Sequence, residues 1–128
     1  MKASKYKVGY DAGSRTYNGI KFDSKMEMRY YMEEIVPKLE TGEYTVCEMQ
    51  KRYILQEKFV HKGRIVRAIE YKADFYIMDK DGHERVIDVK GFATPVALLK
   101  RKLFWYKYPE LDYVWLKYKN KKQGWVEC

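Results

Sequence analysis

The sequence predicts a mixed α/β domain in which helices flank a mixed β-sheet. Three observations support this prediction: a segment with helical periodicity near the N-terminus, a run of extended segments separated by tight-turn signals, and a second helical segment before a last β-prone run. The chain has 128 residues, of which 46% are hydrophobic and 16% are aromatic. This composition is sufficient for one globular core and excludes a disordered protein. We therefore expect the order helix, three strands, helix, strand.

The first helix is predicted from Lys25 to about Leu39. Ser24-Lys25-Met26-Glu27 has the S-x-x-E pattern of a capping box, and apolar residues then recur with a helical period. Pro37 should end or bend the helix near its last turn, because proline lacks the backbone donor. Thr41-Gly42 marks the end of the helix.

Three extended segments follow the first helix. Arg52–Val60 and Arg64–Met78 flank the short hairpin signal His61-Lys62-Gly63. Asp81-Gly82 forms a second tight turn, and Glu84–Lys90 is the third strand. Strands joined by such short turns pair antiparallel.

The second helix should begin at Thr94-Pro95, an N-cap followed by proline at the first helical position. One stripe of this helix is expected to face the core, formed by Val96, Leu99, Leu103 and Tyr106. The last strand is predicted at Leu111–Tyr118 from its β-prone residues. The helix before it is a crossover connection if the third and last strands are parallel, which gives a mixed sheet.

These elements place the folded domain at residues 19–118, between a flexible arm at 1–18 and a basic tail at 119–128. The cysteines Cys47 and Cys128 are far apart and form no CxxC pair, which argues against a disulfide scaffold or zinc site and fits a reducing cytosol. No apolar run approaches the ~20 residues of a membrane span, and the N-terminus has no secretory signal. We therefore expect a cytoplasmic protein without a membrane partner.

The charge of the chain favours a polyanionic partner. Lys and Arg outnumber Asp and Glu by 26 to 18, which gives a formal net charge of +8. Such an excess raises the expectation of nucleic-acid binding, because each neutralised phosphate releases a counterion. The cations predicted to contact DNA are Lys25, Lys100, Arg101 and Lys102. The alternative is a solvated basic face over an aromatic core, and Lys100 in particular could be solvated.

Two carboxylates stand near the ends of strands that one short hairpin joins. Counted out from the turn at Asp81-Gly82, Asp74 and Asp88 should be near neighbours across the strand pair. Converging carboxylates repel unless a cation lies between them, and an oxygen-rich site suits Mg²⁺. Lys90 shares a strand face with Asp88 and could balance the charge that develops on a phosphate. The alternative is a set of surface salt bridges at strand ends.

Four motifs in order resemble a family of small phage-encoded nucleases, formerly known only as a domain of unknown function, within the PD-(D/E)XK superfamily. The motifs are Phe22-Asp23-Ser24-Lys25-Met26-Glu27, Ile69-Glu70-Tyr71-Lys72-Ala73-Asp74-Phe75, Ile87-Asp88-Val89-Lys90-Gly91 and Leu99-Lys100-Arg101-Lys102-Leu103-Phe104. The resemblance spans roughly residues 17–118 and implies a restriction-endonuclease-like core of order α-β-β-β-α-β. Ala73 replaces the eponymous proline, which the superfamily often lacks.

The resemblance implies a Mg²⁺-dependent DNA endonuclease, in which Mn²⁺ can substitute. Asp74 and Asp88 match the metal-binding acids and Lys90 matches the catalytic lysine, while the Val89 carbonyl is expected to help hold the metal. Glu27 matches a helix-borne acid that Holliday-junction resolvases use as a catalytic and metal-binding residue. As the third residue of the capping box, Glu27 also has a purely structural explanation.

Within this class we expect branched or junction DNA as substrate, handled by a homodimer in phage recombination, replication or packaging inside a bacterial host. Sequence-specific cleavage of duplex DNA is an alternative. A non-catalytic nucleic-acid-binding module on a nuclease fold is a second alternative. The intact set of Asp74, Asp88 and Lys90 argues against it. An RNA-binding factor is disfavoured because no RNP-like or KH-like string is present.

Overall fold

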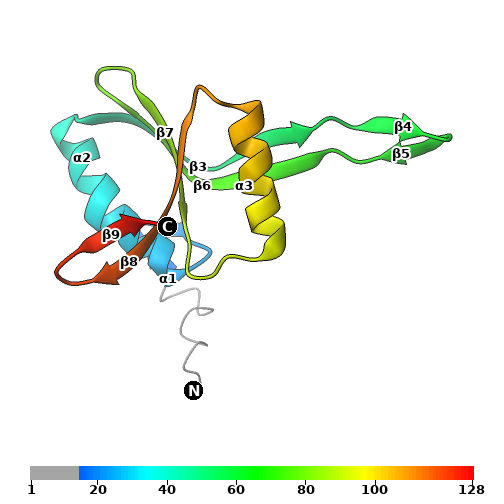
Figure 1. The fold of residues 1–128 in the computed structure, drawn as a ribbon. Coiled ribbons are helices and arrows are strands. Elements are labelled where there is room, and N and C mark those ends of the chain that lie inside the picture. Colours follow the sequence, from blue (N-terminus) through cyan, green and yellow to red (C-terminus); the bar gives the residue numbers. More distant parts are fainter. Residues whose placement is uncertain (1–14) are drawn as a thin grey trace. The chain divides into compact units, whose positions relative to one another are not determined.

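The computed structural model describes residues 15–128, which are drawn in colour in Figure 1. The chain divides into two compact units, the first ending at Thr45 and the second formed by Val46–Cys128. Most of the predicted N-terminal arm lies outside the described residues. The end of the predicted arm and the start of the predicted domain together form a small hairpin of β1 (Thr16–Tyr17) and β2 (Ile20–Lys21), whose turn residues Asn18 and Gly19 both have positive φ.

The first unit contains the predicted N-terminal helix in three pieces. These are α1 (Lys25–Tyr30), a π-helical turn η3 (Tyr31–Ile35) and α2 (Val36–Thr41). The Ser24 hydroxyl caps α1 by accepting from the Glu27 backbone N–H at 3.1 Å, and Gly42 ends α2 in the left-handed conformation. The wider turn stands directly before Pro37, whose ring would clash with the preceding carbonyls of a regular α-helix.

The second unit is organised around a five-stranded sheet of order β3-β6-β7-β8-β9. Its strands are β3 (Tyr44–Gln56), β6 (Ile69–Asp79), β7 (Glu84–Val89), β8 (Asp112–Asn120) and β9 (Gly124–Glu127). β6 and β7 pair antiparallel, and β7 and β8 pair parallel, so the predicted mixed sheet is confirmed. A separate hairpin of β4 (Phe59–His61) and β5 (Arg64–Val66) connects β3 to β6.

The crossover between the parallel strands is α3 (Pro95–Lys107) (Figure 1). The Thr94 hydroxyl caps it by accepting from the Ala97 backbone N–H at 3.0 Å, as its sequence predicts. Beyond the crossover the sheet has one more strand than expected: residues 124–127, placed in the predicted basic tail, form β9 antiparallel to β8. The tight turn before β9 requires a positive φ of 66° at Gly124, which glycine adopts without strain.

The predicted core stripe of α3 is wrong at three of its four residues, since of the four only Leu103 packs against the core. Val96, Leu99 and Tyr106 are 61%, 56% and 87% exposed, whereas Phe104 is fully buried. Phe104 packs against an aromatic cluster on the sheet, at ring-centroid distances of 5.0 Å to Tyr53, 5.7 Å to Tyr71 and 4.4 Å to Tyr113. The helix has apolar residues on more than one face, so periodicity could not select the face that meets these rings.

No helix within residues 15–128 has the length and apolar character needed to cross a membrane. Both cysteines are free, with Cys47 half-buried on β3 and Cys128 exposed. Burial, reinforced by the nearby charge of Glu48, raises the pKa of the Cys47 thiol to about 11.

We expect a thiol-specific reagent at pH 8 to modify Cys128 quickly and Cys47 slowly, because only the thiolate reacts and Cys47 is mostly protonated. The measurement is the time course of thiol titration, native and in urea, with Cys128→Ser as the control that isolates Cys47. Equal rates of modification of the two thiols in the native protein would contradict a half-buried Cys47 with a raised pKa.

Candidate active site

The two aspartates predicted as a pair lie opposite each other at one end of the β6–β7 ladder. The paired register of these strands runs from Met78–Glu84 to Phe75–Ile87, and Asp74 and Asp88 are the next residues. There the carboxylates accept backbone hydrogen bonds: Asp88 Oδ1 from the Asp74 N–H at 3.2 Å, and Asp74 Oδ2 from the Val89 N–H at 2.8 Å. The short hairpin therefore brings the two acids together, as counting from its turn predicts.

Lys90 and Asp88 form a close ion pair. The Lys90 Nζ lies 2.5 Å from Asp88 Oδ2, and the Asp88 side chain is only 4% exposed, against 21% for Lys90. The same ammonium lies 4.8 Å from the ring centre of Trp115, which is the register partner of Asp88 on β8. The lysine is thus fixed between a carboxylate and an indole face.

A tyrosine that the sequence did not single out adjoins the aspartates. Burial, and then the negative charge of Asp88, raises the pKa of the Tyr71 phenol well above its usual range, so Tyr71 stays protonated. Hydrogen bonds of its buried hydroxyl with Tyr113 and Asp88 contribute to the same rise. The protonated phenol is therefore a hydrogen-bond donor beside Asp88.

A hollow of about 280 Å³ lies beside Lys90 and is lined by residues of the second unit. Its walls are formed by Lys90, Gly91, Phe92, Ala93, Leu98, Arg101, Trp115, Lys117 and Cys128. These include three cations and no carboxylate side chain. Phe92 is 80% exposed and offers an apolar surface beside them. Such a lining suits an anion that carries an aromatic or apolar group.

The cations of α3 have different environments. Lys100 is half-buried and its ammonium donates to the Glu70 carbonyl at 2.8 Å, which ties α3 to the start of β6. The Arg101 guanidinium lies 4.1 Å from the Trp115 ring centre and donates to the Cys128 carbonyl at 3.2 Å. Lys102 is exposed. Arg101 therefore faces the hollow with Lys90, whereas Lys100 has a structural bond.

Two predicted site residues, Glu27 and Lys25, belong to the first unit. Glu27 is buried in the first turn of α1, and Ser24 binds its backbone N–H as in the predicted cap. Lys25 is exposed and lines a separate hollow of about 410 Å³ in which three methionines take part. The role of Glu27 as a third metal ligand stays a prediction.

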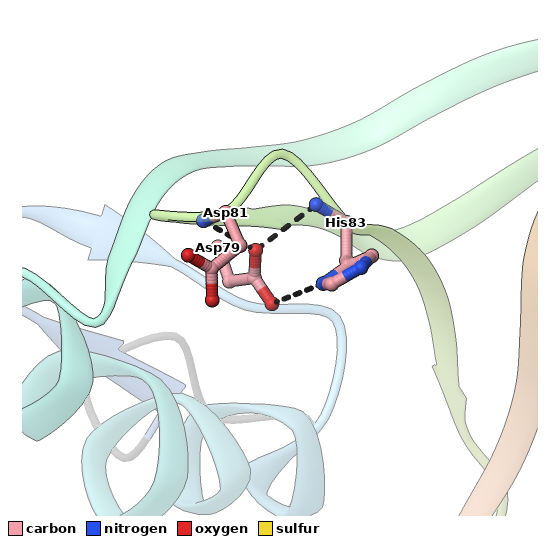
Figure 2. Close-up of side chains that lie close together, drawn as sticks. All are labelled: Asp79, Asp81 and His83. Carbon is pink, nitrogen blue, oxygen red and sulfur yellow. Dashed lines mark hydrogen bonds and ion pairs between the residues drawn. The ribbon is translucent and has the colours of Figure 1, made fainter.

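A different group of metal-ligating residue types lies at the opposite end of the β6–β7 hairpin (Figure 2). Asp79 Oδ1 accepts from the backbone N–H groups of Asp81 and His83, both at 2.9 Å, and Asp79 Oδ2 lies 3.2 Å from His83 Nδ1. These bonds, led by the one from the His83 backbone, lower the pKa of Asp79. They account for the cluster as the closure of a hairpin turn, about 16 Å along β6 from Asp74.

Sequence reasoning missed Trp115 and Tyr71 as neighbours of Asp88, and Lys117 as part of the hollow beside Lys90. Trp115 and Lys117 come from β8, whose register against β7 is parallel and is set by the crossover through α3. No local turn fixes such a register, so no spacing in the sequence could have identified these residues. Tyr71 stands three residues before Asp74, where strand alternation alone does not bring both side chains to one site.

Comparison with known proteins gives one family match. The family model described as "Protein of unknown function (DUF1064)" matches residues 5–124. Searches of curated proteins and of solved structures find no match for the chain.

Proposed function

We propose that the chain, which belongs to the DUF1064 family because the family model covers nearly all of it, is a metal-dependent nuclease that hydrolyses phosphodiester bonds in DNA. One observation carries the proposal: two facing aspartates and a lysine paired with one of them adjoin a hollow lined by three cations. This arrangement combines acids that can hold a metal with cations that can hold phosphates. The resemblance to PD-(D/E)XK nucleases and to their restriction-endonuclease-like core supports it.

The residues at this end of the sheet fit a divalent metal. Asp74 and Asp88 supply carboxylate oxygens and Val89 supplies a carbonyl, and such hard oxygen donors suit Mg²⁺ or Mn²⁺. Each carboxylate oxygen has two acceptor positions, so the backbone hydrogen bonds that Asp74 and Asp88 accept leave capacity for a cation. When bound, the metal would polarise the phosphate and lower the pKa of an attacking water.

The chain's own residues would position and neutralise the phosphodiester. Lys90, held at its place by Asp88 and Trp115, stabilises the negative charge that grows on the phosphate oxygens as water attacks phosphorus. Arg101 and Lys117 bind flanking phosphates along the hollow. The attacking water gives up a proton to solvent, the bond from phosphorus to the leaving sugar oxygen breaks, and that oxygen takes a proton from solvent.

The substrate is DNA, and we propose branched DNA acted on by a homodimer inside a bacterial host. The net charge of +8 supports a polyanionic substrate. Duplex cleavage at a specific sequence is the alternative within the same chemistry. DNA binding without cleavage in any divalent metal would instead assign the chain as a non-catalytic binding module.

The test is incubation of the protein with linear, flapped, fork and four-way DNA in Mg²⁺, in Mn²⁺ or in EDTA. We expect cleavage that requires the metal and is absent from Asp74→Asn protein purified in the same way. The matched control is Asp79→Asn, since Asp79 is an aspartate of the same strand at the far turn. Equal cleavage by wild type and Asp74→Asn would reveal a contaminating nuclease and contradict the proposal.

Mg²⁺ should also stabilise the folded protein, because an ion that binds only the native state shifts the folding equilibrium by mass action. At a hundred times its Kd the ion should add about 2.7 kcal/mol to the free energy of unfolding. We expect the shift in thermal melts of wild type and Asp79→Asn, and none in Asp74→Asn. A shift that survives Asp74→Asn but disappears in Asp79→Asn would place the metal at the hairpin turn.

A further inference from the structure

The β4–β5 hairpin extends from β3 and β6 beyond the five-stranded sheet of the second unit (Figure 1). Its turn residues Lys62 and Gly63 have φ of 49° and 77°, the left-handed pair that a tight hairpin turn requires. Every residue from Glu57 to Ile65 is exposed. A two-stranded hairpin on its own is marginally stable in water, so a regular hairpin with so little burial points to a binding partner.

Two aliphatic side chains near the tip form an exposed apolar pair. Val60 and Ile65 are cross-strand partners and therefore lie on one face, where they are 67% and 69% exposed. Phe59, toward the base of the hairpin, is 46% exposed. An apolar pair at the end of a projecting ribbon is suited to enter a narrow space between flat apolar surfaces.

Cations surround this apolar pair. Between Glu57 and Arg67 the chain carries four cations, Lys58, Lys62, Arg64 and Arg67, against one carboxylate. Within residues 15–128 none of the four takes part in an ion pair. Their charge is complementary to a polyanion, and it opposes pairing of this hairpin with the same hairpin of a second copy.

We propose that the β4–β5 hairpin recognises branched DNA: Val60 and Ile65 pack against base faces where stacking is interrupted, while the surrounding cations bind the backbone phosphates. This inference rests on the proposed function and assigns the part of the chain that recognises its substrate. Proteins insert apolar side chains between base steps, and the energy needed to unstack the bases is smallest where stacking is already broken. A junction or fork therefore offers the hairpin more favourable contacts than an intact duplex does.

The connection to the active site sets a distance. The strand that leaves the hairpin is β6, which carries Asp74 nine residues after Ile65. At ~3.3 Å per residue this segment spans at most about 30 Å, which corresponds to about nine base pairs of 3.4 Å. Cleavage should therefore fall within about nine base pairs of the branch point.

The experiment measures binding in EDTA, without cleavage, to a four-way junction and to linear duplexes of the same arms. We expect wild type to favour the junction. Val60→Ser/Ile65→Ser should weaken junction binding about tenfold and leave linear binding unchanged, because it removes the burial of two aliphatic side chains. Val60→Ile/Ile65→Val, which keeps the apolar surface, is the matched control. Lys58→Gln/Arg67→Gln should weaken binding to both the junction and the linear duplexes, and should lower the slope of log affinity against log salt concentration by about two units.

A fluorescent adenine analogue at the branch gives a direct readout, since its emission rises when a base unstacks. The emission should rise with wild type and with Val60→Ile/Ile65→Val, and should not rise with Val60→Ser/Ile65→Ser. Unchanged junction preference in the double serine variant overturns the inference even if the protein cuts DNA. Junction preference that depends on Val60 and Ile65 without any cleavage supports it and overturns the nuclease proposal. Dissociation of a dimer in the serine variant, measured by sedimentation, would assign the pair to a second copy instead.

Discussion

Replacing Lys90 by methionine should reduce DNA cleavage by about 10²–10³-fold while DNA affinity changes by less than about tenfold, because the lost group stabilises the charge of the transition state. Its ammonium is fixed 2.5 Å from Asp88 and lies at the start of the cation-lined hollow. Methionine keeps the length and apolar stem of lysine but removes its charge. The measurement is single-turnover cleavage in Mg²⁺, normalised to the folded fraction from circular dichroism.

Lys117→Met is the matched control for this prediction. Lys117 lines the same hollow but is exposed, and the ion pair of Asp88 is formed by Lys90 rather than by Lys117. Its loss should weaken DNA binding and lower the slope of log affinity against log salt concentration by about one unit, as expected for one phosphate contact. The cleavage rate of bound DNA should stay near that of wild type. Wild-type cleavage by folded Lys90→Met protein would remove Lys90 from the mechanism.

The parts of the site that follow from local geometry could be predicted from the sequence. The facing positions of Asp74 and Asp88 depend on one short hairpin, and counting from its turn is enough to pair them. The helix caps at Ser24 and Thr94 could also be predicted from the sequence, because a capping side chain binds a backbone donor only three residues away. The order of helices and strands followed from periods of 3.6 and 2 residues.

What the sequence could not supply depends on contacts between distant segments. Trp115 lies beside Asp88 through a parallel register, and Lys100 bonds to the Glu70 carbonyl thirty residues away. The buried face of α3 was misjudged because Phe104 meets rings from three separate strands, which no periodicity of the helix itself encodes. The last strand, β9, was missed because its four residues, Gly124–Glu127, follow a polar stretch and are too few to show a strand period.

The largest effect on stability should also come from Lys90. Asp88 is 3% exposed, and removing the cation beside it leaves a buried carboxylate without its ion partner. Breaking a buried ion pair typically costs 3–5 kcal/mol, and we expect about 3 kcal/mol for Lys90→Met because Lys90 itself keeps a fifth of its surface in water. The measurement is urea unfolding in EDTA, with Lys117→Met expected within about 0.5 kcal/mol of wild type as an exposed cation.

A double-mutant cycle separates this charge effect from lost packing. Adding Asp88→Asn to Lys90→Met removes the unpaired charge, while the amide oxygen can still accept from the Asp74 N–H. The double variant should therefore be more stable than Lys90→Met alone, with a coupling energy of about 1–3 kcal/mol between the two positions. A double variant that is less stable than either single variant, with additive losses, would show that Lys90 and Asp88 act independently. The ion pair would then have no part in holding Lys90 at the site.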